Sequence, residues 1–244
     1  MISPDETGWR VGDLSAWLWA FAASTITIYA ICDGRGFDEA ITVLPADFAG
    51  VLCRDGWAPY RKFTQAVHQS CLAHLLRRCH ELGRSNPPSG RAIPAECSDI
   101  LHDALSARAL RDTGSLNDHT LAATIAELNR RMDQLLRRKP THPANRRLLK
   151  HLRNERSALF SFLTRPGIEA TNWRAEQAVR PAVVNRKICG GNRTWHAAGT
   201  QQVLITLFRT AYQQGVDAIA LLSDLLRSPD TTIAPLAMPL TNGP

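Results

Sequence analysis

The apolar positions in the first part of the chain come in short runs of β-forming residues. Residues 2–11, 16–23 and 25–32 are rich in Trp, Ile, Thr and Tyr, and Gly-Asp and Ser-Thr pairs separate them. Runs of this length and composition predict strands, and three in close succession predict an antiparallel meander. A turn at 33–36 and a short helix at 37–44 are expected to follow.

Two further apolar runs predict buried strands. The first is residues 49–53, which Arg54-Asp55-Gly56 follows. The second is residues 66–71, which lead directly into a helical run at 72–82. A short apolar run that ends in a polar side chain is typical of a strand in an open α/β sheet, where the carboxyl edge carries the chemistry.

Beyond residues 83–94, which are rich in Pro, Ser, Gly and Arg and predict a surface loop or linker, the periodicity becomes helical. A leucine series at 148–163 predicts a helix before Pro166-Gly167. Residues 203–212 and 218–226 predict two amphipathic helices separated by Gly215. The Pro- and Thr-rich residues after Ser228 predict a frayed tail.

One helical stripe has apolar residues every three or four positions. Because it lasts too few heptads for a coiled coil, we interpret it as a packing surface. Its members are Leu121, Ile125, Leu128, Met132 and Leu135.

Composition narrows the class of protein. The 244 residues are 44% hydrophobic and 21% charged, which is typical of a soluble globular chain with a core. The net charge of +7 favours a polyanionic partner, with nucleic acid ahead of an anionic membrane surface. The first residues lack the basic and apolar regions of a signal peptide, and polar residues interrupt the most apolar stretch, 14–31. Six cysteines without a CxxC pair then predict reduced thiols in a cytoplasmic protein that is not in a membrane.

Three carboxylates are candidates for metal binding. Asp5 lies in the first predicted strand, Asp55 ends a buried strand, and Glu176 lies on a short helix, 172–180, that Pro181 is expected to stop. An acid among apolar neighbours is costly unless it is paired or binds a metal. If the first and fourth strands are adjacent, Asp5 and Asp55 project toward the same edge. Hard oxygen ligands suit Mg²⁺, and two ions about 3.5–4 Å apart catalyse phosphodiester displacement.

A structural alternative accounts for the same three residues. Asp5 would cap a turn, Asp55 would serve an Asp-Gly turn, and Glu176 would pair with Arg180 one helical turn later. Because the chain holds 22 acids, spacing alone does not choose between the alternatives.

Four sequence blocks occur in a defined order and together carry more information than any one motif. The first two are Asp5-Glu6-Thr7-Gly8-Trp9-Arg10, with Ala16-Trp17-Leu18-Trp19 after it, and Asp47-Phe48-Ala49-Gly50-Val51-Leu52, with Asp55-Gly56-Trp57-Ala58-Pro59-Tyr60 after it. The other two are Cys71-Leu72-Ala73-His74-Leu75-Leu76-Arg77 and Asn172-Trp173-Arg174-Ala175-Glu176-Gln177-Ala178-Val179-Arg180-Pro181, with Arg186-Lys187 after it.

This ordered set, over residues 3–226, resembles the catalytic domain of transposases of the insertion-sequence-66 family. The resemblance implies an α/β fold: a ribonuclease H-like mixed sheet with a helical insertion and C-terminal helices. The core would occupy residues 1–82 and 167–228, the insertion 83–166, and a flexible tail 229–244. By motif, the catalytic and metal-binding DDE triad is Asp5, Asp55 and Glu176, with Mg²⁺ as cofactor and Mn²⁺ as an alternative ion.

The implied function is two-metal phosphodiester hydrolysis followed by strand transfer, with water as the first nucleophile and a 3′-hydroxyl as the second. The implied partners are DNA, further copies of the chain on DNA, and accessory proteins of the same element. Trp173 and Gln177 stand where the family usually has Asn and Arg, so substrate contacts near the glutamate are expected to differ.

Two other functions remain open. The chain begins just before Asp5, and the family's N-terminal helical, zinc-binding and DNA-recognition segments do not precede it. One alternative is therefore an inactive truncated remnant that binds DNA without catalysis. Another is a structural helical protein whose acids are incidental.

Cys71 and His74 form a CxxH pair. Zinc would need Cys79 and His80 to supply two more ligands. Since related transposases carry such a pair inside the core, we favour a core-supporting role. His74 and Arg77 also match the HxxR of tyrosine recombinases, but the gap to Tyr212 is too long for that arrangement.

Basic residues follow the glutamate helix. Together with Gly190-Gly191-Asn192, they suit a loop that contacts DNA phosphates, and the alternative is a merely solvated loop. Arg137-Arg138-Lys139 and Arg146-Arg147 are weaker candidates, because such runs also arise as helix-end charge or solubilising surface. The predicted DNA-binding residues are Arg180, Arg186, Lys187 and Arg193.

Overall fold

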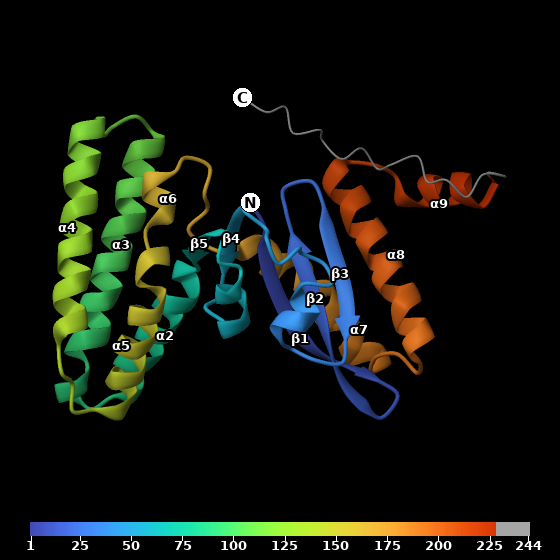
Figure 1. The fold of residues 1–244 in the computed structure, drawn as a ribbon, viewed down its shortest axis with the longest axis horizontal. Coiled ribbons are helices and arrows are strands. Elements are labelled where there is room, and N and C mark those ends of the chain that lie inside the picture. The colour runs from blue at the N-terminus through green and yellow to red at the C-terminus, as the bar shows by residue number, and fades with distance from the viewer. Residues whose placement is uncertain (228–244) are drawn as a thin grey trace. The chain divides into compact units, whose positions relative to one another are not determined.

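A computed structural model describes residues 1–227 and divides the chain into two compact units (Figure 1). The sheet unit comprises Met1–Phe48 and the described residues from Trp173 onward, and the helical unit comprises Ala49–Asn172. The fold is mixed α/β, as the sequence predicts. No helix within residues 1–227 is both long and apolar enough to cross a membrane. The predicted tail, 229–244, lies outside the described residues.

The sheet unit begins with the predicted antiparallel meander. Strands β1 (Ser3–Val11), β2 (Leu14–Ala22) and β3 (Thr27–Cys32) pair in the order β1-β2-β3, with Asp5 opposite Ala20. A short helix, α1 (Phe37–Ala40), follows, and it ends earlier than the predicted 37–44.

Three helices complete the sheet unit: α7 (Trp173–Cys189), α8 (Trp195–Gln214) and α9 (Ala218–Arg227). Gly215, in the left-handed conformation at φ 69°, ends α8 as expected. Alanines on α7 and α8 pack against large side chains of the sheet, so that the backbones approach closely. This core contains Trp9, Val11, Leu18, Ala20, Tyr29, Ile31, Ala178, Val179, Ala182 and Ala198.

The prediction that the glutamate helix stops at Pro181 is wrong, because α7 continues to Cys189. Proline removes one backbone hydrogen bond from a helix interior and strains the preceding turn. Burial of Ala178, Val179 and Ala182 against the sheet offsets that cost.

The free edge of β3 is covered by polar side chains of α8. The backbone N–H groups of Thr27, Tyr29 and Ile31 donate to side-chain oxygens of α8 at 3.3, 2.9 and 2.8 Å. The acceptors recur at intervals of four residues, so they lie on one helix face: Gln202, Thr206 and Thr210. This pairing satisfies an edge that would otherwise be open to another strand.

The helical unit contains a parallel strand pair and a group of helices (Figure 1). The strands are β4 (Val51–Arg54) and β5 (Val67–Ser70), both predicted by the sequence. The helices are α2 (Leu72–Ser85), α3 (Ala92–Asp112), α4 (Asp118–Arg137), α5 (Pro143–Glu155) and α6 (Ser161–Thr164).

Two helix boundaries in this unit differ from the prediction. The predicted loop 83–94 is shorter, because α3 begins at Ala92 and accommodates Pro94 in its first turn, where no backbone N–H is needed. The leucine series 148–163 is divided between α5 and α6 by a 3₁₀ turn, Arg156–Ala158. The apolar stripe of α4 is a packing surface as predicted, with Leu128, Met132 and Leu135 buried.

Candidate active site

Asp5 lies near the start of β1, half-buried, and its Oδ1 accepts the backbone N–H of Glu6 at 3.0 Å. It is therefore part of a strand and not the turn cap considered as an alternative. Side chains alternate between the two faces of a strand, so Asp5 shares a face with Trp9 and Val11. Those two side chains pack in the core beneath α7.

Glu176 lies in the first turn of α7, and its Oε1 atom is buried. Further along the same helix, Arg186 donates to Thr7 Oγ1 at 3.2 Å and to the carbonyl oxygen of Gly8. These contacts fasten the later turns of α7 to the middle of β1.

The direction of α7 follows from a second contact. Asn192, just after α7, pairs with Val11 at the end of β1 in a parallel bridge. Arg186, which precedes Asn192 in the chain, contacts Thr7 and Gly8, which precede Val11 in β1. The helix and the strand therefore run in the same direction. With a rise of about 1.5 Å per residue, Glu176 lies about 15 Å before Arg186 along α7. This direction favours a position of Glu176 toward the end of β1 that carries Asp5, and the pairing of the two carboxylates stays a prediction.

Asp55 belongs to the helical unit, where it directly follows β4. Its Oδ1 accepts the backbone N–H of Trp57 at 2.8 Å, and Gly56 has φ 95°. The Asp-Gly turn is therefore present, and it holds the carboxylate in a fixed position at the end of the strand.

The donor chemistry of the three residues suits magnesium, because all of the available atoms are carboxylate oxygens. Within residues 1–227, no group of three or more His, Cys, Asp or Glu side chains lies close enough together to hold a metal ion. Asp5 and Glu176 lie in the sheet unit and Asp55 in the helical unit, so the triad remains a prediction.

A buried ionic network lies beside Asp55, and the sequence did not predict it. Arg54 Nη1 contacts Glu155 Oε2 at 2.5 Å, and the two side chains are 2% and 0% exposed. Arg61 reaches the other oxygen, Oε1, at 3.0 Å, and Arg54 Nε donates to His68 Nδ1 at 3.0 Å. Burial lowers the pKa of the Arg54 guanidinium, and the Glu155 carboxylate opposes that shift.

This network holds the turn that carries Asp55. Arg61 Nη1 also donates to the carbonyl oxygen of Gly56 at 3.2 Å. A Cβ atom at position 56 would lie 2.6 Å from His151 Cε1, so only glycine fits there. One signal in the sequence could have revealed the network: Glu155 interrupts the buried side of the leucine series, three residues after Leu152.

Cys71 and His74 lie at the start of α2. The Cys71 sulfur accepts the backbone N–H of Asn172 at 3.3 Å, and the N–H of Leu72 donates to Ala170 at 2.9 Å. These bonds tie α2 to the segment that leads into α7, and the core-supporting role of Cys71 and His74 stays a prediction. Cys79, which a zinc site would need, instead hydrogen bonds to the Cys97 thiol of α3.

The predicted DNA-contacting cations differ in their surroundings. Arg180, Lys187 and Arg193 are exposed, whereas Arg186 is bound to β1. The loop before Arg193 is anchored, because Asn192 exchanges backbone hydrogen bonds with the β1–β2 turn: its N–H donates to Arg10 O at 2.9 Å, and its carbonyl accepts from Gly12 at 2.8 Å. A fixed loop with an exposed cation suits phosphate contact.

A family model described as "Transposase IS66 family" matches residues 1–200. The chain belongs to this family. Its members are transposases, so by family the protein is a DNA-processing enzyme that acts in transposition and has DNA as its partner. The family's DDE designation suggests the use of a divalent metal. No curated protein and no solved structure matches the chain.

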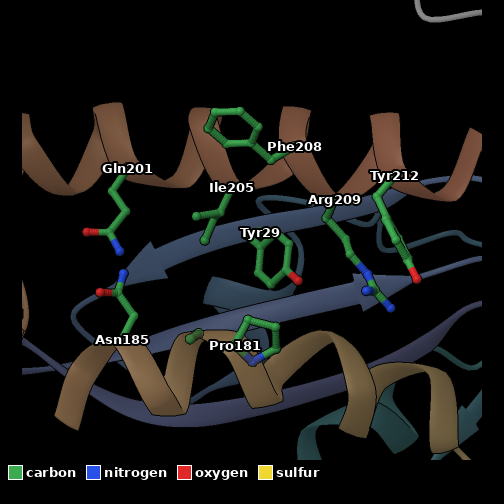
Figure 2. Close-up of a pocket in the computed structure, with 9 residues that line it drawn as sticks. Tyr29, Pro181, Asn185, Gln201, Ile205, Phe208, Arg209 and Tyr212 are labelled. Atoms are coloured by element: carbon green, nitrogen blue, oxygen red, sulfur yellow. The ribbon is translucent and has the colours of Figure 1, made fainter. Parts of the chain in front are cut away.

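In this transposase chain, a separate cavity of about 280 Å³ lies between β3, α7 and α8 (Figure 2). Figure 2 shows the Tyr29 ring between Ile205 on α8 and Pro181 on α7. The Tyr29 hydroxyl donates to the carbonyl of Ala178 at 2.7 Å, and burial raises its pKa to about 12, so it stays protonated. No residue of the predicted triad lines this cavity.

The histidines beside Asp55 predict a dependence of stability on pH. Burial lowers the pKa of both His68 and His151 below their ordinary value of 6.5, and Arg54 adds to the effect at His68. The unfolded chain binds these protons first as the pH falls. The stabilisation is therefore complete above about pH 6.5 and is lost as the pH falls through the folded pKa values.

Urea denaturation at pH 7.5 and pH 5.5 measures this loss. The decrease in the free energy of unfolding should be smaller in a His68→Gln, His151→Gln double variant than in the wild type. An equal decrease in both proteins would contradict the assignment.

Proposed function

We propose that this chain is the catalytic part of a DDE transposase, in which Asp5, Asp55 and Glu176 bind two Mg²⁺ ions, with Mn²⁺ as an alternative. The reaction is phosphodiester hydrolysis followed by strand transfer, which moves an insertion element in DNA. One observation carries the proposal: α7, which holds Glu176, is fastened along β1, which holds Asp5, through Arg186 and Asn192. Membership of the IS66 transposase family supports it.

The proposal requires Asp55 to join this pair. The meander β1-β2-β3 lies in the sheet unit and the parallel pair β4-β5 in the helical unit, and we propose that both belong to a ribonuclease H-like core. Asp55, which follows the carboxyl end of β4, supplies the third carboxylate of the proposed site. In this scheme residues 83–166 form an insertion, and residues 1–82 and 167–228 form the core.

The residues of the chain act by position and charge. When bound, two magnesium ions would supply charge neutralisation and activation of the attacking oxygen. The three carboxylates hold them, while Arg180, Lys187 and Arg193 contact DNA phosphates. Water is the nucleophile in the first step and a DNA 3′-hydroxyl in the second. No covalent bond to the enzyme forms, because phosphoryl transfer depends almost entirely on positioning and electrostatics.

Metal dependence tests the proposal. The full chain should nick DNA that carries the ends of its element in the presence of Mg²⁺ or Mn²⁺. Excess EDTA should stop the reaction and added Mg²⁺ should restore it. Nicking that continues in EDTA would overturn the two-metal mechanism, and DNA binding without nicking in Mg²⁺ would favour the non-catalytic remnant.

The proposed working form is a homo-oligomer on DNA in the cytoplasm, with accessory proteins of the same element as further partners.

A further inference from the structure

A cluster of cations lines a hollow of about 410 Å³ where α4 ends and α5 begins. The hollow lies within the helical unit, and its floor includes the buried side chain of Leu149. Over residues 137–153 the chain carries seven Lys or Arg residues and no acid. We call this site the α4–α5 basic hollow, and its charged residues are Arg138, Lys139, Arg146, Lys150 and Arg153.

Most of this positive charge is not neutralised by the protein. Arg138 pairs with Glu96 of α3 at 2.5 Å, with both side chains partly exposed. The other four cations make no ion pair among the residues that the structure describes. Arg146 and Arg153 donate to the backbone carbonyls of Thr141 and Leu136, which fixes their guanidinium groups at the rim while leaving further N–H donors.

Helix stability does not account for the arrangement. Cations near the end of α4, such as Arg137, are favourable because they face the negative end of the helix dipole. Arg146 and Arg147, however, lie in the first turns of α5, which has no acid in its first turn. Positive charge at that end of a helix is unfavourable, so these residues are not explained as helix-end charge.

The spacing of the cations fits a nucleic-acid backbone. Arg146, Lys150 and Arg153 stand four and three residues apart, so they share one face of α5. The three span about 10 Å along the helix. Each strand of duplex DNA carries one phosphate per about 3.4 Å of axis, so about three phosphates of one strand face this length.

The surface around the hollow does not suit a membrane. Helices that bind at a membrane interface combine cations with exposed large apolar side chains. Among the described residues of the helical unit, the exposed large apolar side chain is Leu110, near the C-terminal end of α3. No exposed large apolar side chain lies within residues 137–153. The hollow offers the N–H donors of Lys and Arg side chains and no apolar side chain that could insert into a membrane. This combination favours the phosphate groups of a nucleic acid over a membrane surface.

We propose that the α4–α5 basic hollow binds the phosphate backbone of duplex DNA without reading its sequence. The residues that line the hollow lie in the helical unit and do not include Asp5, Asp55 or Glu176. This assignment rests on the proposed function only in taking DNA as the partner, and it needs neither the metal ions nor cleavage.

Removal of two charges tests the proposal. In the full chain, Lys139→Gln with Lys150→Gln removes two exposed cations whose side chains make no hydrogen bond or ion pair to other residues within 1–227. Fluorescence anisotropy with a labelled 30-base-pair duplex of arbitrary sequence, in EDTA, gives Kd between about 0.05 and 0.2 M salt. We expect Kd to rise about tenfold or more at 0.1 M salt, and the salt slope to fall by up to about 1.8, because each phosphate contact contributes about 0.9.

A second pair of substitutions gives a matched control. Arg130→Gln with Arg165→Gln removes the same charge elsewhere on the helical unit. Arg130 is paired with Glu127 on α4. Arg165 directly follows α6, and the carbonyl oxygens of α6 accept hydrogen bonds from Arg111 near the end of α3. Glu96, which contacts the hollow through Arg138, lies near the other end of α3. This control should change Kd less than about twofold, and thermal unfolding should show that both variants keep the fold.

Two results would overturn the assignment. Equal DNA affinity in the two variants would mean that only total charge matters. Loss of binding to vesicles of phosphatidylserine and phosphatidylcholine, with DNA binding intact, would make the hollow a membrane contact. Because EDTA removes metal from every measurement, failure of the carboxylate mechanism leaves this test unaffected.

Discussion

Asp55→Asn should abolish metal-dependent DNA cleavage, with a rate at least about 10³-fold below that of the wild type, while DNA binding stays within about twofold. The substitution removes the negative charge that a metal ion requires and keeps the shape of the side chain. The Asn Oδ1 can still accept the N–H of Trp57, so the turn at the end of β4 should persist. Rate and affinity are measured separately, by nicking in Mg²⁺ and by anisotropy in EDTA.

The partners of Asp55 should behave in the same way. Asp5→Asn and Glu176→Gln should each cause a comparable loss, and combining two substitutions should add little, because ligands of one metal site act as a unit. Asp47→Asn serves as the control, since Asp47 is an exposed acid in the same sequence block as Asp55. Cleavage by Asp55→Asn at the wild-type rate would exclude Asp55 from the site.

Glu155→Ala should have the largest effect on stability, lowering the free energy of unfolding by about 3–5 kcal/mol. The reason is the guanidinium of Arg54, which is 2% exposed and would be left buried without its counter-charge. Arg61 would lose its carboxylate contact as well, and with it support for the turn at Gly56. Urea denaturation at pH 7.5 measures the change.

Two companion variants show whether the buried charge is the cause. Glu127→Ala removes an exposed carboxylate that is also paired with an arginine, and it should leave stability unchanged. Glu155→Leu combined with Arg54→Met removes both charges and should recover most of the loss, because an apolar pair needs no counter-ion. A decrease below about 1 kcal/mol in Glu155→Ala would contradict the buried-charge explanation.

The division between sequence and tertiary structure is clear at Pro181 and Pro94. Both residues predict a helix boundary or a loop, since proline lacks an N–H. In the structure α7 continues through Pro181, because its alanines are buried against the sheet. Helix α3 begins before Pro94, because backbone N–H groups in the first turn of a helix have no acceptor within the helix. Packing decided the first case and position within the helix the second.

The sequence alone determined the elements whose signals are local. Short runs of β-forming residues predicted the meander, and a compact apolar run predicted the strand that directly precedes Asp55. Ordered motifs predicted the transposase family, and the family model confirms it. These features depend on neighbours within a few residues, so they can be read without knowing the fold.

Only the tertiary structure decided which distant residues meet. Arg54 and Glu155 are 101 positions apart, and nothing local to either predicts their contact. Arg186 was predicted to contact DNA but is bound to β1, and that contact holds the later turns of α7 against the middle of β1. The cations of the α4–α5 basic hollow were ordinary charge runs in the sequence. They form one site because the end of α4 and the start of α5 lie together, and helix ends come together through core packing rather than through the charged residues themselves.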